Sequence, residues 1–202
     1  MLMRPDINPI LLDIPTELTS ERLLIRAARP GDGPALNAAV VESLETLRPW
    51  MPWAQSAPSL DDSESYAREA AAKFALREDL PLLLFRREDG LFVGGSGLHH
   101  IDWTVPRFEI GYWVRASLQG QGYITEAVRR LTDFAFEALY AQRIEIRCDA
   151  LNTRSAAVAK RCGYMLEARF RRHSRGVDGR LRDTLVYAMI ADDWALNREP
   201  VG

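Results

Sequence analysis

A glycine-rich segment near the middle of the chain contains residue types that can bind phosphate. The segment Q-G-Q-G, residues 119–122, lies between an apolar run that ends near Val114 and a stretch of helical spacing that begins near Tyr123. The start of a helix has unpaired backbone N–H groups and the positive end of the helix dipole, and both attract anions. Glycine lets the backbone approach phosphate oxygens closely, and glutamine and Thr125 can add hydrogen bonds. The segment is therefore either a phosphate-binding loop or a plain turn from strand to helix.

The spacing of these glycines excludes two common nucleotide-binding motifs. The chain contains no G-x-x-x-x-G-K-[ST] sequence, so it has no nucleoside-triphosphate P-loop. It also lacks G-x-G-x-x-G, and the strand before the loop belongs to a predicted meander rather than to a βαβ unit. A dinucleotide-binding fold is therefore not expected here.

The histidines and cysteines predict no metal site. Three histidines are too few and too scattered for a zinc framework, and Cys148 and Cys162 do not form a C-x-x-C pair. His99 and His100 are neighbours, so on a regular strand they point to opposite faces and do not chelate together. Cys148 falls on the apolar face of a strictly alternating strand, which favours a core position over a nucleophile.

Composition and charge exclude several other classes of protein. Of the 202 residues, 47% are hydrophobic and 27% charged, which fits one soluble globular domain. The formal net charge of -2 predicts no bulk attraction to nucleic acid or to an anionic membrane. The N-terminal segment has no sustained apolar region typical of a signal peptide, and no apolar run is long enough to span a bilayer. We therefore expect a cytoplasmic protein.

The elements that must position the loop alternate between helical and strand patterns. Their predicted order is β-α-α-β-β-β-α-β-α-β-β, with Pro34 in the first turn of one helix and Ser59 capping the next. Short apolar runs from Pro81 onward predict an antiparallel meander of three strands before the glycine loop. A strictly alternating strand, a short helix that Asn152 can cap, and two strands joined at residues 178–179 follow. This order predicts a mixed α/β sheet. We expect an N-terminal arm at residues 1–15, one domain at 16–195 and a C-terminal tail at 196–202.

Five segments, in the same order, resemble one family of acetyltransferases. Q-G-Q-G at a helix start resembles the Q/R-x-x-G-x-G/A acyl-CoA loop of the Gcn5-related N-acetyltransferase (GNAT) superfamily. T-S-E-R-L-L-I-R, F-E-I-G-Y-W-V, N-T-R-S-A-A-V-A-K-R-C-G-Y and W-M-P-W resemble segments of the RimJ/RimL ribosomal-protein N-terminal acetyltransferase group. The resemblance covers about residues 16–195. The chain departs from the superfamily pattern at two positions. The last position of the loop is Ile124, where the superfamily has glycine or alanine. Ala159 stands where many members have the tyrosine that acts as general acid.

The resemblance implies the fold, the cosubstrate and the residues that hold it. It implies a mostly antiparallel sheet of about seven strands flanked by about four helices. Acetyl-CoA, or another acyl-CoA, is the implied cosubstrate, and no metal is implied. The implied coenzyme A site contains Trp113, Val114 and Asn152 near the pantetheine arm, and Gln119, Gly120, Gln121, Gly122, Tyr123, Ile124 and Thr125 around the pyrophosphate.

The resemblance also implies two residues for proton transfer. Glu109 matches the point in the strand where histone-acetylating members place a glutamate, so it is the candidate base. It shares a strand face with Gly111 and Trp113, although a solvated or salt-bridged glutamate would show the same pattern. Ser155 matches a serine of RimL-like members and is the candidate acid in place of the missing tyrosine. Its position in the first helical turn also suits a capping role.

The acceptor side is less well defined by the sequence. Trp50 and Trp53 flank a rigid Met-Pro pair and suit a substrate wall, or else a plug in the core. His99 is the third candidate substrate-binding residue. The expected acceptor is the α-amine of a protein N-terminus, and a homodimer is one arrangement that the resemblance allows. Two alternatives stay open: an acetyl- or succinyltransferase for small-molecule amines, and a module that binds acyl-CoA without turnover.

Overall fold

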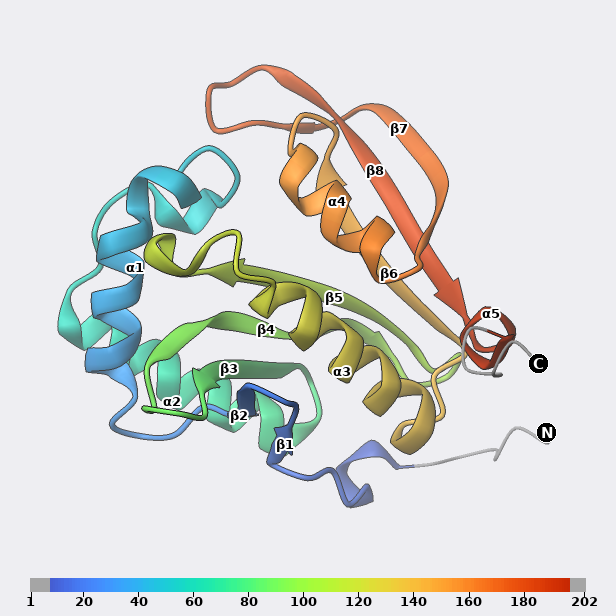
Figure 1. The fold of residues 1–202 in the computed structure, drawn as a ribbon, viewed down its shortest axis with the longest axis horizontal. Helices are drawn as coiled ribbons and strands as arrows, with labels where there is room; N and C mark the ends of the chain where they lie inside the picture. Colours follow the sequence, from blue (N-terminus) through green and yellow to red (C-terminus); the bar gives the residue numbers. More distant parts are fainter. Residues whose placement is uncertain (1–7, 197–202) are drawn as a thin grey trace.

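The computed structural model describes residues 8–196 and contains one mixed sheet (Figure 1). Within this range the sheet has eight strands in the order β1-β2-β3-β4-β5-β6-β8-β7. All neighbouring strands are antiparallel except β5 and β6, which are parallel. The strands are β1 (Glu17–Thr19), β2 (Leu23–Ala27), β3 (Leu80–Arg86), β4 (Phe92–Asp102), β5 (Arg107–Val114), β6 (Arg143–Asp149), β7 (Met165–Arg175) and β8 (Leu181–Ile190). The predicted mixed fold is confirmed, and the strand beyond the expected seven is the short β1.

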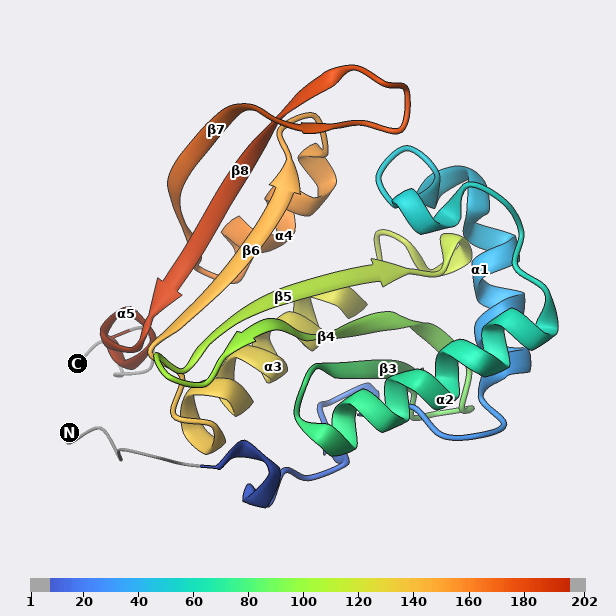
Figure 2. The ribbon, with the colours of Figure 1, turned by 180° about the vertical axis from the view of Figure 1, so that it is seen from behind.

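Helices cover both faces of the sheet. Helices α3 and α4 lie over the face seen in Figure 1, and α1 and α2 lie over the opposite face, seen in Figure 2. The helices are α1 (Gly33–Leu47), α2 (Leu60–Leu76), α3 (Tyr123–Ala138), α4 (Thr153–Arg161) and α5 (Ala191–Leu196), of which α5 was not predicted. A capping box between Ser59 and Asp62 starts α2, and Asn152 caps α4, as expected from the sequence.

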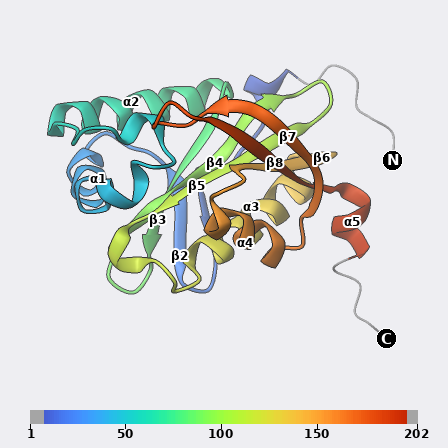
Figure 3. The same ribbon diagram turned by 90° about the horizontal axis from the view of Figure 1, so that it is seen from above.

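The core follows from the alternation of the strands and the apolar stripe of α3. Ala127, Leu131 and Ala135 on α3 are fully buried against the sheet. A smaller apolar cluster beneath α1 and α2 includes Leu36, Ala67 and Phe92. Ile14, in the expected N-terminal arm, is also buried. Strands β4 and β5 therefore lie between two helical layers (Figure 3).

Strands β5 and β6 part in the middle of the sheet. Their register covers the pairs Arg107↔Arg143, Phe108↔Ile144 and Glu109↔Glu145, and it ends there. Beyond this point β5 continues with β4 while β6 continues with β8, so the two strands diverge (Figure 2). The end of β5 therefore has backbone groups on the β6 side that no neighbouring strand pairs.

Candidate active site

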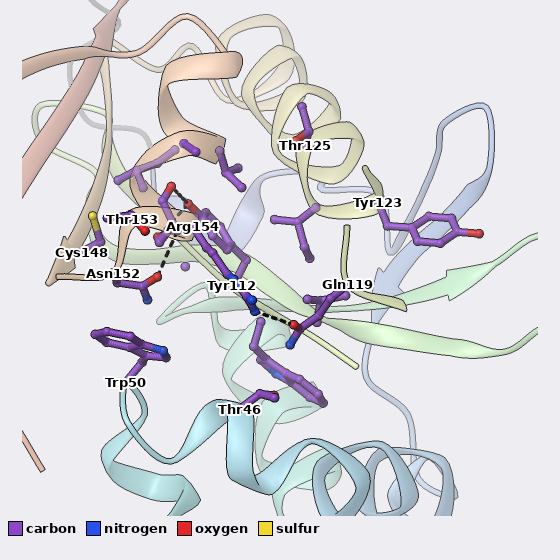
Figure 4. Close-up of a pocket in the computed structure, with 18 of the residues that line it drawn as sticks. Thr46, Trp50, Tyr112, Gln119, Tyr123, Thr125, Cys148, Asn152, Thr153 and Arg154 are labelled. Atoms are coloured by element: carbon purple, nitrogen blue, oxygen red, sulfur yellow. Dashed lines mark hydrogen bonds between the residues drawn. The ribbon is translucent and has the colours of Figure 1, made fainter. Parts of the chain in front are cut away.

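A cavity of about 1020 Å³ lies where β5 and β6 part (Figure 4). Its walls come from the end of α1, the end of β5, the glycine loop, β6 and α4. Most of the predicted site residues line it, namely Trp50, Trp113, Val114, Gln119, Gly120, Gly122, Tyr123, Ile124, Thr125, Asn152 and Ser155. Gln121, Trp53, His99 and Glu109 do not line this cavity.

The glycine loop presents a row of unpaired backbone donors. No described residue accepts a hydrogen bond from the N–H groups of residues 120–125. Gly120 and Gly122 have φ angles of 76° and 83°, a left-handed conformation that glycine adopts at little cost. The side-chain oxygen of Gln119 accepts a hydrogen bond of 2.8 Å from Arg154, which ties the loop to α4. A row of free donors at the positive end of a helix dipole is the arrangement that attracts anions such as phosphate.

The side chains of this loop support the backbone rather than face the cavity. The ring of Tyr123 points away from the other cavity residues (Figure 4) and lies 4.5 Å below the guanidinium of Arg22. Ile124 is 8% exposed and belongs to the core. The side-chain amide of Gln121 donates to the backbone carbonyl of Ser117. The backbone carbonyl of Gln121 accepts a hydrogen bond from the Arg22 guanidinium. Tyr123 and Ile124 therefore contribute their backbone N–H groups to the site.

Ser155 belongs to a small polar cluster on one side of the cavity. Its hydroxyl lies 3.0 Å from the hydroxyl of Tyr112, which also donates to the Ser155 carbonyl at 3.0 Å. Its backbone N–H donates to the Asn152 side chain, so the predicted cap is present. Burial raises the pKa of Tyr112 and also that of the Cys148 thiol, so both groups stay protonated near neutral pH. Tyr112 was not predicted, although strand alternation places it on the face opposite Glu109.

Glu109 lies in a second, smaller cavity of about 230 Å³. The lining residues are His100, Arg107, Phe108, Glu109, Glu145 and Arg147. Burial raises the pKa of Glu109, against the opposing effect of nearby positive groups, of which His100 and Arg147 are the largest. The Arg147 guanidinium lies 3.6 Å from the Glu109 carboxylate. Glu109 is therefore a partly buried carboxylate with an incomplete ion pair, separated from Ser155 by strand β5.

A bulge in β4 lies at the two histidines. The register between β4 and β5 shifts between His99 and Asp102, and His100 has a φ of 48°. His100 lines the smaller cavity with Glu109, and His99 pairs with Glu109 across the strands. The opposite directions of the two side chains stay a prediction.

The two predicted tryptophans occupy different positions. Trp50 is 37% exposed and lines the main cavity opposite Asn152 (Figure 4). Trp53 is 54% exposed and packs edge-to-face on Trp113, with ring centroids 6.0 Å apart. Neither is a buried core plug, so both are available at the surface of the α1–α2 connection.

The described residues contain neither a metal-ligand cluster nor a membrane-spanning helix. No group of three or more metal-ligating side chains occurs within residues 8–196. No helix in the same range is long and apolar enough to cross a membrane.

The loop, the divergent strands and the cavity between them define a family. The sequence pattern of the Acetyltransferase (GNAT) domain matches residues 22–165, and the chain belongs to this family of acetyltransferases. The predicted family and class of enzyme are thereby confirmed. The chain is 29% identical to the YdaF protein of Bacillus subtilis (strain 168), over 87% of this chain and 94% of that protein. It is 26% identical to the ribosomal-protein-serine acetyltransferase of Escherichia coli (strain K12), over 86% of this chain and 95% of that protein.

A solved structure of RimL, a ribosomal α-N-protein acetyltransferase, has the same fold. The TM-score is 0.80 at 26% identity, and the match covers 89% of this chain and 98% of that chain. That structure contains coenzyme A in a disulfide with a cysteine. The sheet, the helices and the RimJ/RimL-like resemblance predicted from the sequence are therefore shared with a ribosomal-protein acetyltransferase.

Proposed function

We propose that this acetyltransferase transfers the acetyl group of acetyl-CoA to the α-amine of a protein N-terminus in the cytoplasm. One observation carries the proposal: the unpaired N–H groups of residues 120–125 border a large cavity at the open edge of β5. This arrangement suits a cosubstrate with a phosphate group at one end and an amide-containing arm. Acetyl-CoA has both, and it supplies an acetyl group that is activated as a thioester.

The described residues fit each part of this cosubstrate. The N–H groups of Gly120, Gly122 and the first turn of α3 would hold the pyrophosphate. The pantetheine amides would pair with the free backbone edge of β5 near Trp113 and Val114, in the manner of an added strand. Asn152 lines the same cavity and would contact this arm from α4.

The acceptor assignment rests on similarity to ribosomal-protein acetyltransferases and on two exposed tryptophans near the cavity. RimL and the Escherichia coli relative are both named as ribosomal-protein acetyltransferases. In this chain, Trp50 and Trp53 form an exposed aromatic wall beside the cavity, which suits contact with a peptide segment. A homodimer stays a prediction.

Proton transfer requires an acid and a base near the transferred group. Ser155 is the proposed acid, because its hydroxyl lies in the main cavity with Tyr112 as a hydrogen-bond partner. Glu109 is the carboxylate predicted as the base, and its raised pKa favours proton uptake. Substitution of Glu109 by glutamine tests this role. A base role predicts a kcat loss of about 100-fold or more, whereas an unchanged rate across pH contradicts it.

Thiol release from acetyl-CoA, measured across acceptors, tests the whole proposal. We expect turnover with peptides that have a free N-terminal amine and little with N-terminally blocked peptides of the same sequence. Turnover with polyamines or free amino acids alone would favour the small-molecule transferase. Binding of coenzyme A without thiol release for any acceptor would favour the non-catalytic module.

A further inference from the structure

A histidine on β4 and an aspartate just before β3 form a dyad. The Nδ1 atom of His99 lies 2.9 Å and 3.0 Å from the two carboxylate oxygens of Asp79. The pair follows from register, because Leu80 at the start of β3 opposes Leu98 on β4, which places Asp79 beside His99. Each side chain is a little under one-third exposed, so the dyad is accessible from solvent.

The hydrogen bond to Asp79 fixes which nitrogen of His99 can accept a proton. A carboxylate can only accept a hydrogen bond, so Nδ1 carries the hydrogen in the neutral ring. The Nε2 atom then has a free lone pair. No described residue forms a hydrogen bond with Nε2.

Glycines on two strands leave space for this ring. A β-carbon on Gly97 would lie 2.9 Å from Nε2 of His99, and one on Gly111 would lie 3.1 Å from its Cδ2. Any larger residue at either position would push the imidazole away from the sheet. The Nε2 edge of the ring therefore packs against Gly97 and Gly111, while Nδ1 bonds to Asp79.

Gly111 connects this ring to the proposed reaction site. It lines the main cavity together with Tyr112 and Ser155, and it also packs against the His99 ring. Strand β6 does not pair with β5 at this level. His99 does not line the cavity itself, but no side chain at position 111 separates its ring from a group held there.

We infer that His99 is a catalytic residue that accepts the proton of the acceptor amine at Nε2, with Asp79 as its positioning residue. The inference rests on the proposed function. The amine nitrogen loses a proton to Nε2 and forms the new C–N bond, the C–S bond breaks, and the departing thiolate takes a proton from Ser155 or solvent. In this assignment Glu109, which opposes His99 on β5, is not the base, so Glu109→Gln and His99→Asn measured side by side decide between the two.

Other titratable groups lie near the dyad. Asp79 contacts His99 directly, Glu109 opposes it from β5, and Tyr66 on α2 lies near Asp79. Burial, together with the Asp79 carboxylate, raises the pKa of Tyr66, so this phenol stays neutral in the assay range.

Matched asparagine variants at two histidines test the inference. His99→Asn keeps a donor toward Asp79 but cannot accept a proton, whereas His173→Asn makes the same change at an exposed histidine of β7 that lines neither cavity. We expect His99→Asn to lower kcat about 100-fold or more, with coenzyme A affinity unchanged. His173→Asn should keep the wild-type rate. Asp79→Asn should give an intermediate loss.

The pKa of the acceptor separates a base from a merely structural residue. A peptide mimic whose amine is mostly unprotonated at the assay pH depends less on a base to remove its proton. The rate of transfer to this mimic should therefore fall far less in His99→Asn than the rate of transfer to an ordinary N-terminus. Equal losses for both acceptors, or a wild-type kcat in His99→Asn, would overturn the inference. Absence of transfer by the wild-type protein would instead refute the proposed function.

Discussion

Substitution of Gly120 by alanine tests the phosphate site most directly. Gly120 has a φ of 76°, and a β-carbon there would meet no atom within 4 Å. The folded protein should therefore lose only the cost of a left-handed alanine, about 1 kcal/mol. Because Gly120 lines the cavity, the added methyl group would occupy space beside the N–H donors of the loop.

The expected loss of affinity follows from these donors. A hydrogen bond to a charged group contributes about 1.5–3 kcal/mol. Displacement of the phosphate from one such donor would weaken coenzyme A binding about 10- to 150-fold. Isothermal titration with coenzyme A measures this change, and denaturant unfolding measures the free energy of folding of the same samples.

Gly90→Ala is the matched control. Gly90 has a φ of 72°, and a β-carbon there also meets nothing within 4 Å, but the residue does not line the cavity. Both variants should lose the same stability, and only Gly120→Ala should lose affinity. Wild-type affinity in Gly120→Ala, or an equal loss in Gly90→Ala, would refute a phosphate site at this loop.

Two further predictions concern the acid and the stability of the fold. Ser155→Ala should lower kcat about 100-fold while the Kd of coenzyme A stays unchanged. Ser65→Ala, on the exposed surface of α2, is the control and should keep the wild-type kcat. An unchanged kcat in Ser155→Ala would contradict the role of Ser155 as the acid. Asp32→Asn should lower the free energy of unfolding at pH 7 by roughly 1–3 kcal/mol, because Asp32 accepts hydrogen bonds from Arg26 at 2.6 Å and 2.8 Å. Burial alone would raise the pKa of Asp32, but the bonds from Arg26 and the Arg29 N–H lower it below 3.8. The contribution of Asp32 to the free energy of unfolding is therefore present above about pH 4 and lost below it. Urea titrations should show equal free energies of unfolding for Asp32→Asn and the wild type in acid, and different ones at neutral pH.

Local sequence patterns were enough to predict the main elements and the loop. Gly120 and Gly122 between a strand and a helix indicate a left-handed turn before a helix start, and the structure has both. The Asn152 cap, the Ser59 cap and the final hairpin follow from equally local signals.

The surroundings of Glu109 and His99 depend on contacts between distant segments, which no local sequence pattern contains. Alternation predicts that Glu109 shares a face with Gly111, but it does not reveal that Glu109 opens into a separate cavity. The pairing of Asp79 with His99 depends on the register of β3 against β4, which is set across residues 79–99 by the turn between the strands. The bulge at His100 has no glycine to mark it, so the bulge was not predicted.

The short contact between β5 and β6 has a mechanical consequence. The two parts of the sheet, β1–β5 and β6–β8, join through the register pairs at residues 107–109 and then separate. A cosubstrate held by β5, the loop and α4 would act as a cross-link between these parts. Because it would bind the folded chain and not the unfolded one, a concentration of about 100 times its Kd would add about 2.7 kcal/mol to stability. The thermal stability of this protein should therefore follow the acetyl-CoA supply around it.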